Sequence, residues 1–282
     1  MCGHQDGKIV IVGGTNWEGG KKNWLKEVRV FDPRIGKWSV INFGYPVAYG
    51  VGIQADDSAF SFVGGSDGRE PFKAIGNVAD ANASFLNAPR LPSSLVLASG
   101  GEVKGKIILV GGSDDAAHLA GVTASTYLIT SSISRRLADY PGKPFATAAS
   151  TVVGEELLVF GGMNYDEVNQ AAVNTAEAYA FSPEKNVWRK LKPLAAPTRG
   201  LTAVTLDDNH IYIAGGYRED FTAEAVIYEV KADSYRKAPS LPYAAMVGLV
   251  KMGEHVYCLG GEDKKQSRTD KFFRIPVAEL LK

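Results

Sequence analysis

The segment Gly260–Phe273 carries the charged residues whose spacing best suits chemistry. It reads GGEDKKQSRTDKFF, so Glu262 directly follows a Gly-Gly pair and Arg268 comes six residues later, ahead of an apolar run. A carboxylate can accept and return a proton, and a guanidinium can hold an anion through two parallel hydrogen bonds. The pair therefore has the residue types for acid/base catalysis on an anionic substrate. The alternative is a surface ion pair at the start of a strand, which contributes about 0–1 kcal/mol to stability.

Three further residues could complete a binding site around such a pair. Asn16, Arg199 and Tyr217 each lie in a predicted loop. An amide can hydrogen-bond to hydroxyl groups, a guanidinium can bind a carboxylate, and a flat ring can cover the face of a sugar. We therefore predict these three as substrate-binding residues for an anionic sugar. The alternative is ordinary surface polarity, because exposed loops are polar in most proteins.

The residues that bind metals or act as nucleophiles show no pattern that would add a cofactor. The four histidines have no metal-ligand spacing: His4, His118, His210 and His255. Cys2 and Cys258 are the two cysteines, and Cys258 is interpreted as a small buried hydrophobic residue. No Gly-x-Ser-x-Gly nucleophile motif occurs. We therefore predict no metal and no other cofactor.

The charge balance argues against nucleic-acid and membrane partners. Lysine plus arginine equal aspartate plus glutamate at 31 each, so no basic excess attracts a polyanion. No apolar run approaches the roughly 18 residues needed to cross a bilayer. The N-terminal stretch MCGHQDGK is polar and shows no export signal. A small neutral or anionic molecule is the partner that this composition favours, and the composition does not indicate an oligomeric state.

A short apolar run that ends in Gly-Gly occurs six times. The first glycines of these pairs are 45 to 54 residues apart: Gly13, Gly64, Gly111, Gly161, Gly215 and Gly260. Kelch repeats are about 50 residues long, and each forms one four-stranded blade. The sequence therefore predicts an all-β fold, a six-bladed Kelch-type β-propeller, as a single domain over residues 1–282. We attribute the glycine pairs to tight backbone packing rather than to phosphate binding, because GGTNWEGGKK lacks the Gly-Lys-Ser/Thr order.

Other residues repeat in the same register. Trp38 and Trp188 mark fourth strands, and small-residue stretches such as AYGVGI and GLTAVTL fit the crowded innermost strand of a blade. Antiparallel alternation places the loops after strands two and four at the same end of the ring. The residues that follow each Gly-Gly pair should therefore converge on one opening of the central channel, and we predict this opening as the ligand site.

The two ends of the chain predict an incomplete closure of the ring at the N-terminus. The first recognisable strand, Lys8–Val12, has the character of a second strand, and Lys271–Pro276 that of a third. A first strand of blade one and a fourth strand of blade six are then missing, which exposes sheet edges. Either the terminal residues partly cover the gap, or the natural polypeptide begins about 25 residues earlier, as the repeat length suggests.

Two segments resemble one family in particular. GGEDKKQSRTDKFF is similar to a pattern of the Kelch-type N-acetylneuraminate epimerases, the sialic acid mutarotases, in which Gly-Glu is followed six residues later by Arg-Thr-Asp and an apolar strand. WEGGKKNW with PVAYGVGI is similar to a second part of that family. This second part comes first here, whereas in the better-known members it lies after the blade with the glutamate and the arginine. The chain thus resembles the cyclically permuted mutarotase branch.

The resemblance implies a function for the charged pair. It makes Glu262 and Arg268 the catalytic residues of a cofactor-free interconversion of sialic acid anomers. It also implies a periplasmic location, although no export signal is visible in this chain. The alternatives are a non-catalytic Kelch propeller that binds a protein and a mutarotase for a different sugar. A protein-binding face predicts a broad apolar patch, whereas the loops after the Gly-Gly pairs are polar.

Overall fold

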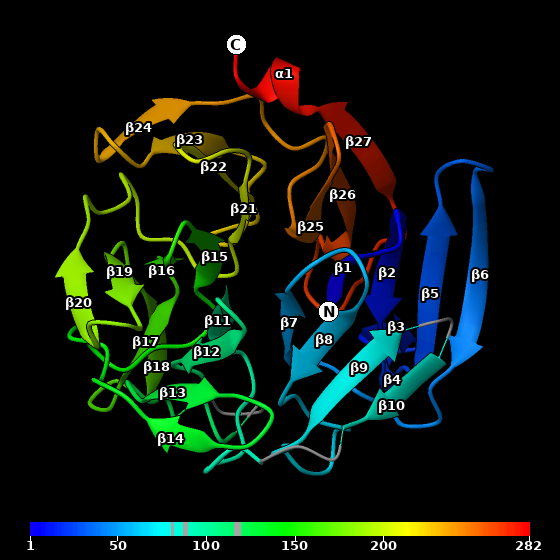
Figure 1. The fold of residues 1–282 in the computed structure, drawn as a ribbon, viewed down its shortest axis with the longest axis horizontal. Helices are drawn as coiled ribbons and strands as arrows, with labels where there is room; N and C mark the ends of the chain where they lie inside the picture. Colours follow the sequence, from blue (N-terminus) through cyan, green and yellow to red (C-terminus); the bar gives the residue numbers. More distant parts are fainter. Residues whose placement is uncertain (80–81, 87–89, 116–119) are drawn as a thin grey trace.

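Six antiparallel sheets form a ring around a central axis, and each sheet is one blade (Figure 1). The computed structural model describes residues 1–79, 82–86, 90–115 and 120–282, so His118 lies outside the described residues. Within these residues, blades one to five have four strands each and blade six has three. The all-β fold and the six-bladed Kelch-type arrangement predicted from the Gly-Gly repeat are confirmed.

The first strand of each blade lies nearest the axis. Blade one consists of β1 (Cys2–Gln5), β2 (Lys8–Val12), β5 (Glu27–Asp32) and β6 (Lys37–Asn42). Blade two consists of β7 (Val51–Gln54), β8 (Phe60–Val63), β9 (Ile75–Ala79) and β10 (Asn82–Phe85). Blade three consists of β11 (Ser99–Val103), β12 (Lys106–Val110), β13 (Thr126–Ile129) and β14 (Ser134–Arg136).

The second half of the ring repeats this order. Blade four consists of β15 (Ala149–Val153), β16 (Glu156–Phe160), β19 (Ala178–Ser182) and β20 (Val187–Lys190). Blade five consists of β21 (Thr202–Thr205), β22 (His210–Ala214), β23 (Ala225–Glu229) and β24 (Ser234–Lys237). Blade six consists of β25 (Met246–Met252), β26 (His255–Glu262) and β27 (Phe272–Pro276). Two hairpins project from blades one and four: β3 (Thr15–Glu18) with β4 (Lys21–Trp24), and β17 (Met163–Asp166) with β18 (Ala171–Asn174).

The hydrophobic core is divided into layers between neighbouring blades. One layer joins Ile108 and Val110 of blade three to Leu157 and Val159 of blade four, and all four side chains are buried. Alternate residues of a strand point to opposite faces, so a blade that is covered on both sides needs apolar residues on both faces. The nearly continuous apolar runs before each Gly-Gly pair meet this need.

The Gly-Gly repeat has a steric cause. In blades one to five the N–H of the second glycine donates to a carbonyl in the link to the next blade, as from Gly14 to Val47 and from Gly162 to Thr198, both 2.8 Å. The first glycine approaches the same link closely, because a Cβ on Gly161 would lie 2.5 Å from the Thr198 carbonyl oxygen. A side chain there would push successive blades apart. The predicted role of these pairs in backbone packing is confirmed.

Blade one contains the innermost strand that the sequence analysis did not find. Strand β1 pairs with β2, with Gln5 opposite Lys8. Asp6 and Gly7 connect them with positive φ angles of 49° and 69°. Such angles are typical of a two-residue type I′ hairpin, for which Asp-Gly is a strong signal. The prediction that the ring is incomplete at the N-terminus was therefore wrong, because MCGHQDGK was interpreted as a polar end rather than as a hairpin.

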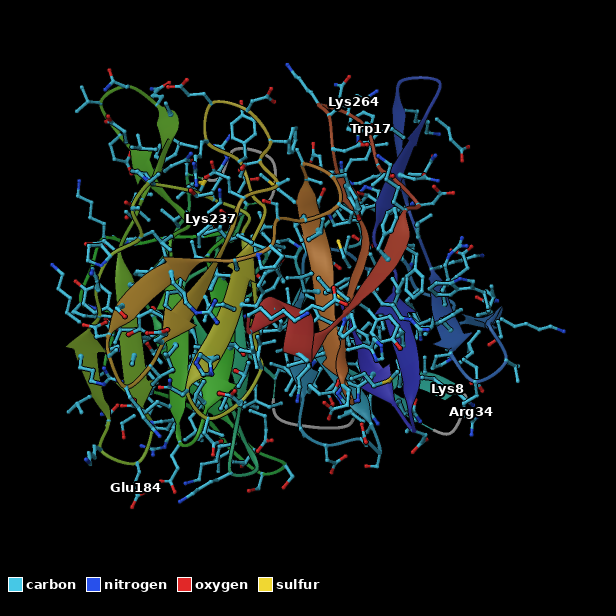
Figure 2. The ribbon with its side chains drawn as sticks, turned by 90° about the horizontal axis from the view of Figure 1, so that it is seen from above. Lys8, Trp17, Arg34, Glu184, Lys237 and Lys264 are labelled. Carbon is cyan, nitrogen blue, oxygen red and sulfur yellow. The ribbon has the colours of Figure 1, made fainter. Side chains whose placement is uncertain are left out.

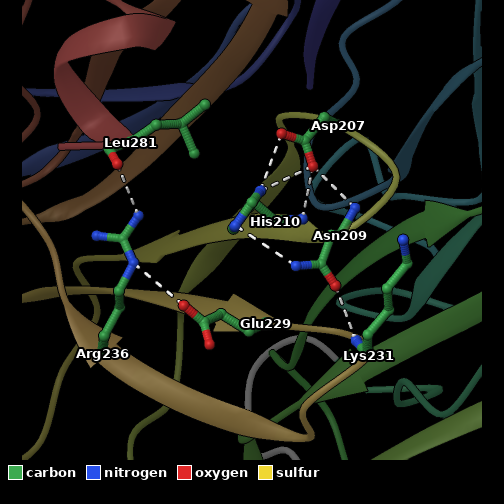
Figure 3. Close-up of polar contacts among 7 residues, drawn as sticks. All are labelled: Asp207, Asn209, His210, Glu229, Lys231, Arg236 and Leu281. Carbon is green, nitrogen blue, oxygen red and sulfur yellow. Dashed lines mark hydrogen bonds and ion pairs between the residues drawn. The ribbon is translucent and has the colours of Figure 1, made fainter.

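Blade six lacks a fourth strand among the described residues, as predicted. After β27 the chain forms the short helix α1 (Val277–Leu280), and no helix in the described ranges is long and apolar enough to cross a bilayer. Val277 and Leu280 pack into the core between blades five and six. The Leu281 carbonyl accepts a hydrogen bond from Arg236 of β24 at 3.2 Å (Figure 3). The C-terminal residues are therefore held against blade five and do not extend the sheet of blade six.

Side chains close the ring between blades six and one. Ile9 of β2 packs with Val250, Tyr257 and Leu259 of blade six, and all four are buried. Phe272 of β27 adds a ring contact with Phe31 of β5, with 4.8 Å between centroids. This closure relies on side-chain packing, since no strand of one blade pairs with a strand of the other in the described sheets.

Candidate functional site

A cavity of about 570 Å³ lies on the axis, at the end of the ring where the Gly-Gly pairs are found. Inner-strand residues form part of its wall, among them the small residues Gly52, Gly100 and Ser150. The same three residues border a second space of about 290 Å³ that continues along the inner strands toward the other end. The residues of the inner strands must be small, because a Cβ on Gly52 would lie 2.9 Å from the Phe60 ring.

The loops after the second strands gather at one end of the ring, which we call the mouth. Figure 2 shows Trp17 and Lys264 at this end, and both residues lie after a second strand. Arg34 and Glu184, which lie in turns between third and fourth strands, are at the opposite end. The arrangement agrees with the predicted convergence of these loops on one opening.

Each blade presents two residues at the mouth in the same way. The carbonyl of the second glycine accepts a hydrogen bond from a later loop residue in all six blades: Leu25, Phe72, Thr123, Thr175, Thr222 and Thr269. The residue after the glycine pair lies opposite the residue before this donor, as in Thr15–Trp24, Ser66–Pro71, Ser113–Val122, Met163–Asn174 and Tyr217–Phe221. In blade six the same two positions are Glu262 and Arg268. Each of the six blades has two such positions among the described residues. Blade six alone has a charged residue at both of its positions.

The structure brings Glu262 and Arg268 together beside the cavity. Arg268 Nη1 lies 3.2 Å from Glu262 Oε2 and donates to the Ser267 carbonyl at 2.7 Å. The Glu262 side chain is 31% exposed and the Arg268 side chain is 19% exposed, so solvent is partly excluded from the pair. Arg268 also forms part of the cavity wall, whereas Glu262 is not among the residues that line it. Both contacts use Nη1, and the Nη2 and Nε groups have no hydrogen-bond partner among the described residues.

A β-bulge determines where Glu262 lies. The pairing of β25 with β26 shifts register between Met246, opposite Glu262, and Gly248, opposite Leu259. Bulges redirect side chains and are frequent next to active sites. The register shift therefore places Glu262 differently from the regular continuation of β26.

Tyr243 supports the strand that carries this bulge. Its hydroxyl donates to the Gly260 carbonyl at 2.8 Å, and Lys271 Nζ lies 4.9 Å from the centre of its ring. Burial, together with the neighbouring Cys258 thiol, raises the pKa of Tyr243, so the hydroxyl stays protonated and keeps donating. This contact fixes the start of the loop that carries Arg268.

Arg199 and Tyr217, two of the predicted binding residues, lie against each other. The Arg199 guanidinium is 4.6 Å from the centre of the Tyr217 ring, and its Nη1 donates to Asn174 Oδ1 at 3.3 Å. Asn174 Nδ2 donates in turn to the Tyr217 carbonyl at 3.0 Å. No carboxylate pairs with Arg199 in the described part of the chain. The cluster is ordered but lies outside the set of residues that line the cavity.

Asn16 lies on the hairpin β3–β4, opposite Asn23. Its Nδ2 donates to Glu18 Oε1 at 3.2 Å, whereas its Oδ1 is buried without a hydrogen-bond partner. Thr15 lines the cavity but Asn16 does not. The described contacts do not connect Asn16 with Glu262, Arg268 or Arg199, so its role in binding stays a prediction.

A cationic and aromatic cluster on blades one and two was missing from the predicted site. Tyr49 lines the cavity, and its ring makes an edge contact with Trp24 at 5.4 Å. Lys22 Nζ lies 4.6 Å from the centre of the Tyr49 ring and 4.9 Å from that of Trp24. The hairpin β3–β4 positions Lys22 and Trp24, which explains GGTNWEGGKK without a phosphate loop. The segment WEGGKKNW contains both residues and was the signal that could have identified them.

A belt of backbone hydrogen bonds runs around the mouth from blade two to blade five. Leu97 N–H donates to the Tyr49 carbonyl, Thr147 to Leu97 and Gly200 to Thr147, at 2.8, 2.9 and 2.8 Å. All four residues have positive φ angles, between 57° and 64°. A positive φ is costly for a branched residue such as Thr147. The inter-blade bonds hold these residues in that conformation.

The cysteines and other possible metal ligands are dispersed. Cys2 and Cys258 are free thiols, and Cys258 is buried, as predicted. Burial raises the pKa of the Cys258 thiol to about 11, so it is protonated at neutral pH. Within the residues that the structure describes, no three His, Cys, Asp or Glu side chains come close enough together to hold a metal ion.

Comparison with protein families supports the interpretation of the repeats. Residues 2–42 and 144–195 match the family described as Kelch motif. These ranges cover blade one and blade four, in each of which a Gly-Gly pair and a fourth-strand tryptophan occur together. The chain is a six-bladed β-propeller that contains Kelch motifs.

The relatives of this Kelch propeller have names of two kinds. N-acetylneuraminate epimerase from Salmonella enteritidis PT4 is 24% identical over 175 residues, which cover 49% of this chain and 46% of that protein. The Yersinia pestis protein of the same name is 35% identical over 86 residues, or 29% and 21% of the two chains. Kelch-like protein 35 from Mus musculus is 28% identical over 172 residues, or 61% and 28%. The chain spans less than half the length of each of these relatives.

Proposed function

We propose that this Kelch propeller is an isomerase that interconverts the anomers of N-acetylneuraminic acid without a cofactor. The observation that carries the proposal is the partly shielded Glu262–Arg268 pair, 3.2 Å apart, beside the cavity at the mouth. The relatives named N-acetylneuraminate epimerase support the choice of substrate. A mutarotase for another acidic sugar would use the same pair.

Glu262 acts as the proton carrier in this proposal. The anomeric hydroxyl loses its proton to the Glu262 carboxylate while the bond between the anomeric carbon and the ring oxygen breaks. The ring oxygen then takes the proton back, which gives the open-chain keto acid. After rotation about the bond next to the carbonyl, the same steps run in reverse and close the ring with the opposite configuration. No proton is gained or lost overall, so one carboxylate suffices.

Arg268 positions the substrate for this transfer. The carboxylate of sialic acid is attached to the anomeric carbon itself. If the free Nη2 and Nε groups of Arg268 bind that carboxylate in bidentate fashion, the anomeric carbon lies next to the carboxylate of Glu262. Arg199, Tyr217 and Asn16 are proposed to contact the rest of the sugar, and Tyr49 is added because it lines the cavity.

The test is to follow freshly released α-N-acetylneuraminic acid by proton NMR with purified protein. Glu262→Gln and Arg268→Ala should each slow equilibration by about 10²- to 10⁴-fold and stay folded, because both residues are partly exposed. A matched control is Glu224→Gln, which breaks the Arg218–Glu224 ion pair (2.7 Å) of blade five. This control should equilibrate the anomers at the rate of the unmodified protein. Unchanged rates in both Glu262→Gln and Arg268→Ala would refute the assignment.

A non-catalytic role in binding a protein is the second candidate, favoured by the similarity to Kelch-like protein 35 over 61% of this chain. It predicts that the unmodified protein accelerates the mutarotation of no sugar. A panel of freshly dissolved single anomers, sialic acid and neutral sugars together, separates the three possibilities. Acceleration of a neutral sugar alone would keep the isomerase activity but change the substrate.

A further inference from the structure

The outer edge of blade six is an unpaired strand edge. β27 pairs only with β26 in the described sheets. The Gly260 N–H donates to the Lys271 carbonyl and the Val277 N–H to the Glu254 carbonyl, so residues 271 and 277 direct their backbone groups toward β26. In an antiparallel ladder this direction alternates. Phe272 and Arg274 therefore direct their N–H and C=O groups outward, away from the sheet.

In blades four and five, the fourth-strand aromatic residue is covered by the previous blade. Trp188 of blade four donates from Nε1 to the Ala138 carbonyl at 3.0 Å, and Tyr235 of blade five donates to the Lys192 carbonyl at 2.7 Å. Ala138 and Lys192 occupy the same place, two residues after the fourth strand of the preceding blade. An aromatic donor and a carbonyl of the preceding blade thus recur as a structural unit.

Trp38 is the corresponding residue of blade one, and its partner is absent. Its predecessor is blade six, for which the described residues form no fourth strand, and Trp38 Nε1 makes no hydrogen bond within this part of the chain. Trp38 is 44% exposed, although it contacts Phe31 and Phe272, and Val40 on the same strand is 59% exposed. The apolar surface of β6 and the free edge of β27 therefore border the space that a fourth strand would occupy.

Two exposed arginines border this space, and the partly buried Glu27 lies on the same face of β5 as one of them. Arg29 lies opposite Val40 in blade one, and Arg274 follows two residues after Phe272 on the same face of β27. Both are exposed, and neither forms an ion pair within the described residues. The nearby Asp32 is already neutralised by Arg34 at 2.7 Å. The aromatic cluster of Phe31, Trp38 and Phe272 is thus flanked by two arginines without an ion pair among the described residues. One lies on β5 and the other on β27.

We propose that blade six binds an acidic, extended segment of a partner polypeptide, which pairs with β27 as the missing fourth strand. Alternate residues of a strand face the same side. The segment therefore places an apolar residue against Trp38 and Phe272, and a carboxylate two residues before and after it faces Arg29 and Arg274. A later carbonyl of the segment accepts the hydrogen bond of Trp38 Nε1. This inference uses the outer rim and does not depend on the proposed isomerase activity at the mouth.

The probe is a fluorescein-labelled peptide of sequence GGEVLVEG, whose glutamate and leucine side chains share one face. Its binding is measured by fluorescence anisotropy, with GGKVLVKG as the charge-reversed control. The acidic peptide should bind at least about tenfold more tightly than the basic one, and less tightly as salt is added. In hydrogen exchange, the Phe272 and Arg274 amides should become protected only when the acidic peptide is present.

Variants identify the contacts. Trp38→Ala should weaken peptide binding about tenfold, as expected when a central aromatic contact is removed. Arg29→Ala and Arg274→Ala should each weaken it about threefold and reduce its salt dependence. The matched control is Val187→Ala, which alters an apolar residue, 52% exposed, on the fourth strand of the complete blade four. Val187→Ala should leave peptide binding unchanged.

Three results would overturn the proposal. The first is equal binding of the acidic and basic peptides, and the second is unchanged binding in Trp38→Ala. The third is protection of the Phe272 and Arg274 amides in the protein without peptide, together with a dimer in sedimentation velocity. That result would identify a second copy of the chain as the occupant of the edge.

Discussion

Blades four and one carry the same local pattern in different surroundings. In each, a third-strand phenylalanine pairs across the sheet with a fourth-strand tryptophan, Phe181 with Trp188 and Phe31 with Trp38. Blade three covers Trp188 with Tyr140, 5.3 Å away between ring centroids, and accepts its indole hydrogen bond. Blade six leaves Trp38 partly open. The contribution of a repeated residue therefore depends on the preceding blade as much as on its own.

Truncating the two tryptophans should give the largest difference between these interfaces. Trp188→Ala should lower the free energy of unfolding by about 3 kcal/mol, because it leaves a cavity between two blades. Trp38→Ala should lower it by roughly 1 kcal/mol, because less apolar surface is withdrawn from water at this site. Urea denaturation of both variants measures the two values. Equal losses would mean that the missing strand does not determine how much Trp38 stabilises the protein.

Replacing each indole with a benzene ring isolates the hydrogen bond. Trp188→Phe should cost about 1 kcal/mol of stability, since the Ala138 carbonyl loses its donor. Trp38→Phe should change stability by less than about 0.5 kcal/mol, because its indole N–H has no partner to lose. The measurement is the shift in the urea midpoint at constant slope. A larger loss for Trp38→Phe would contradict the proposed vacancy in blade six.

The innermost strands of blades one and four should differ in how their contribution to stability changes at acidic pH. Burial lowers the pKa of His4 on β1 below 6.5, although Asp57 opposes this shift. The unfolded chain therefore binds a proton at His4 more tightly than the folded protein does. This histidine contributes stability above about pH 6.5 that is lost as the pH falls toward its folded pKa. The inner strand of blade four, Ala149–Val153, has no titratable side chain.

The matched measurement compares the unmodified protein with His4→Gln. The urea midpoint of the unmodified protein should fall more between pH 7.5 and pH 5.5 than that of His4→Gln. We expect this to be the smallest of the three effects, because the Asp57 ion pair offsets part of the burial. An identical fall in both proteins would show that other groups cause the acid sensitivity.

The repeat made the ring predictable from sequence, because the Gly-Gly pairs report a steric requirement that recurs in every blade. The first strand of blade one was missed because its polar residues, His4 and the buried Gln5, hide the strand pattern. The Asp6-Gly7 turn was the informative signal there. Propensity along one segment could not reveal β1, because its stability comes from pairing with β2 and from packing against blade six.

The charged pair was predictable for a similar reason and the rest of the site was not. Glu262 and Arg268 occupy positions that the repeat defines in every blade, so aligning the blades places them opposite each other. Asn174 of blade four meets Arg199 and Tyr217 at the next blade, and the sequence separation of Asn174 from these two residues gives no sign of this contact. The Tyr49 cluster depends on the hairpin β3–β4, whose direction is set by tertiary contacts.

The belt of backbone hydrogen bonds at the mouth restrains only part of the rim, from blade two to blade five. Backbone hydrogen bonds link the residues that precede four consecutive inner strands. They run from Tyr49 through Leu97 and Thr147 to Gly200. The series stops before blade six, where Met246 instead lies opposite Glu262. Widening the channel at blades two to five would require breaking these ties, whereas the sector with Glu262 and Arg268 can shift without doing so. The backbone belt therefore ends before the part of the rim that carries the charged pair.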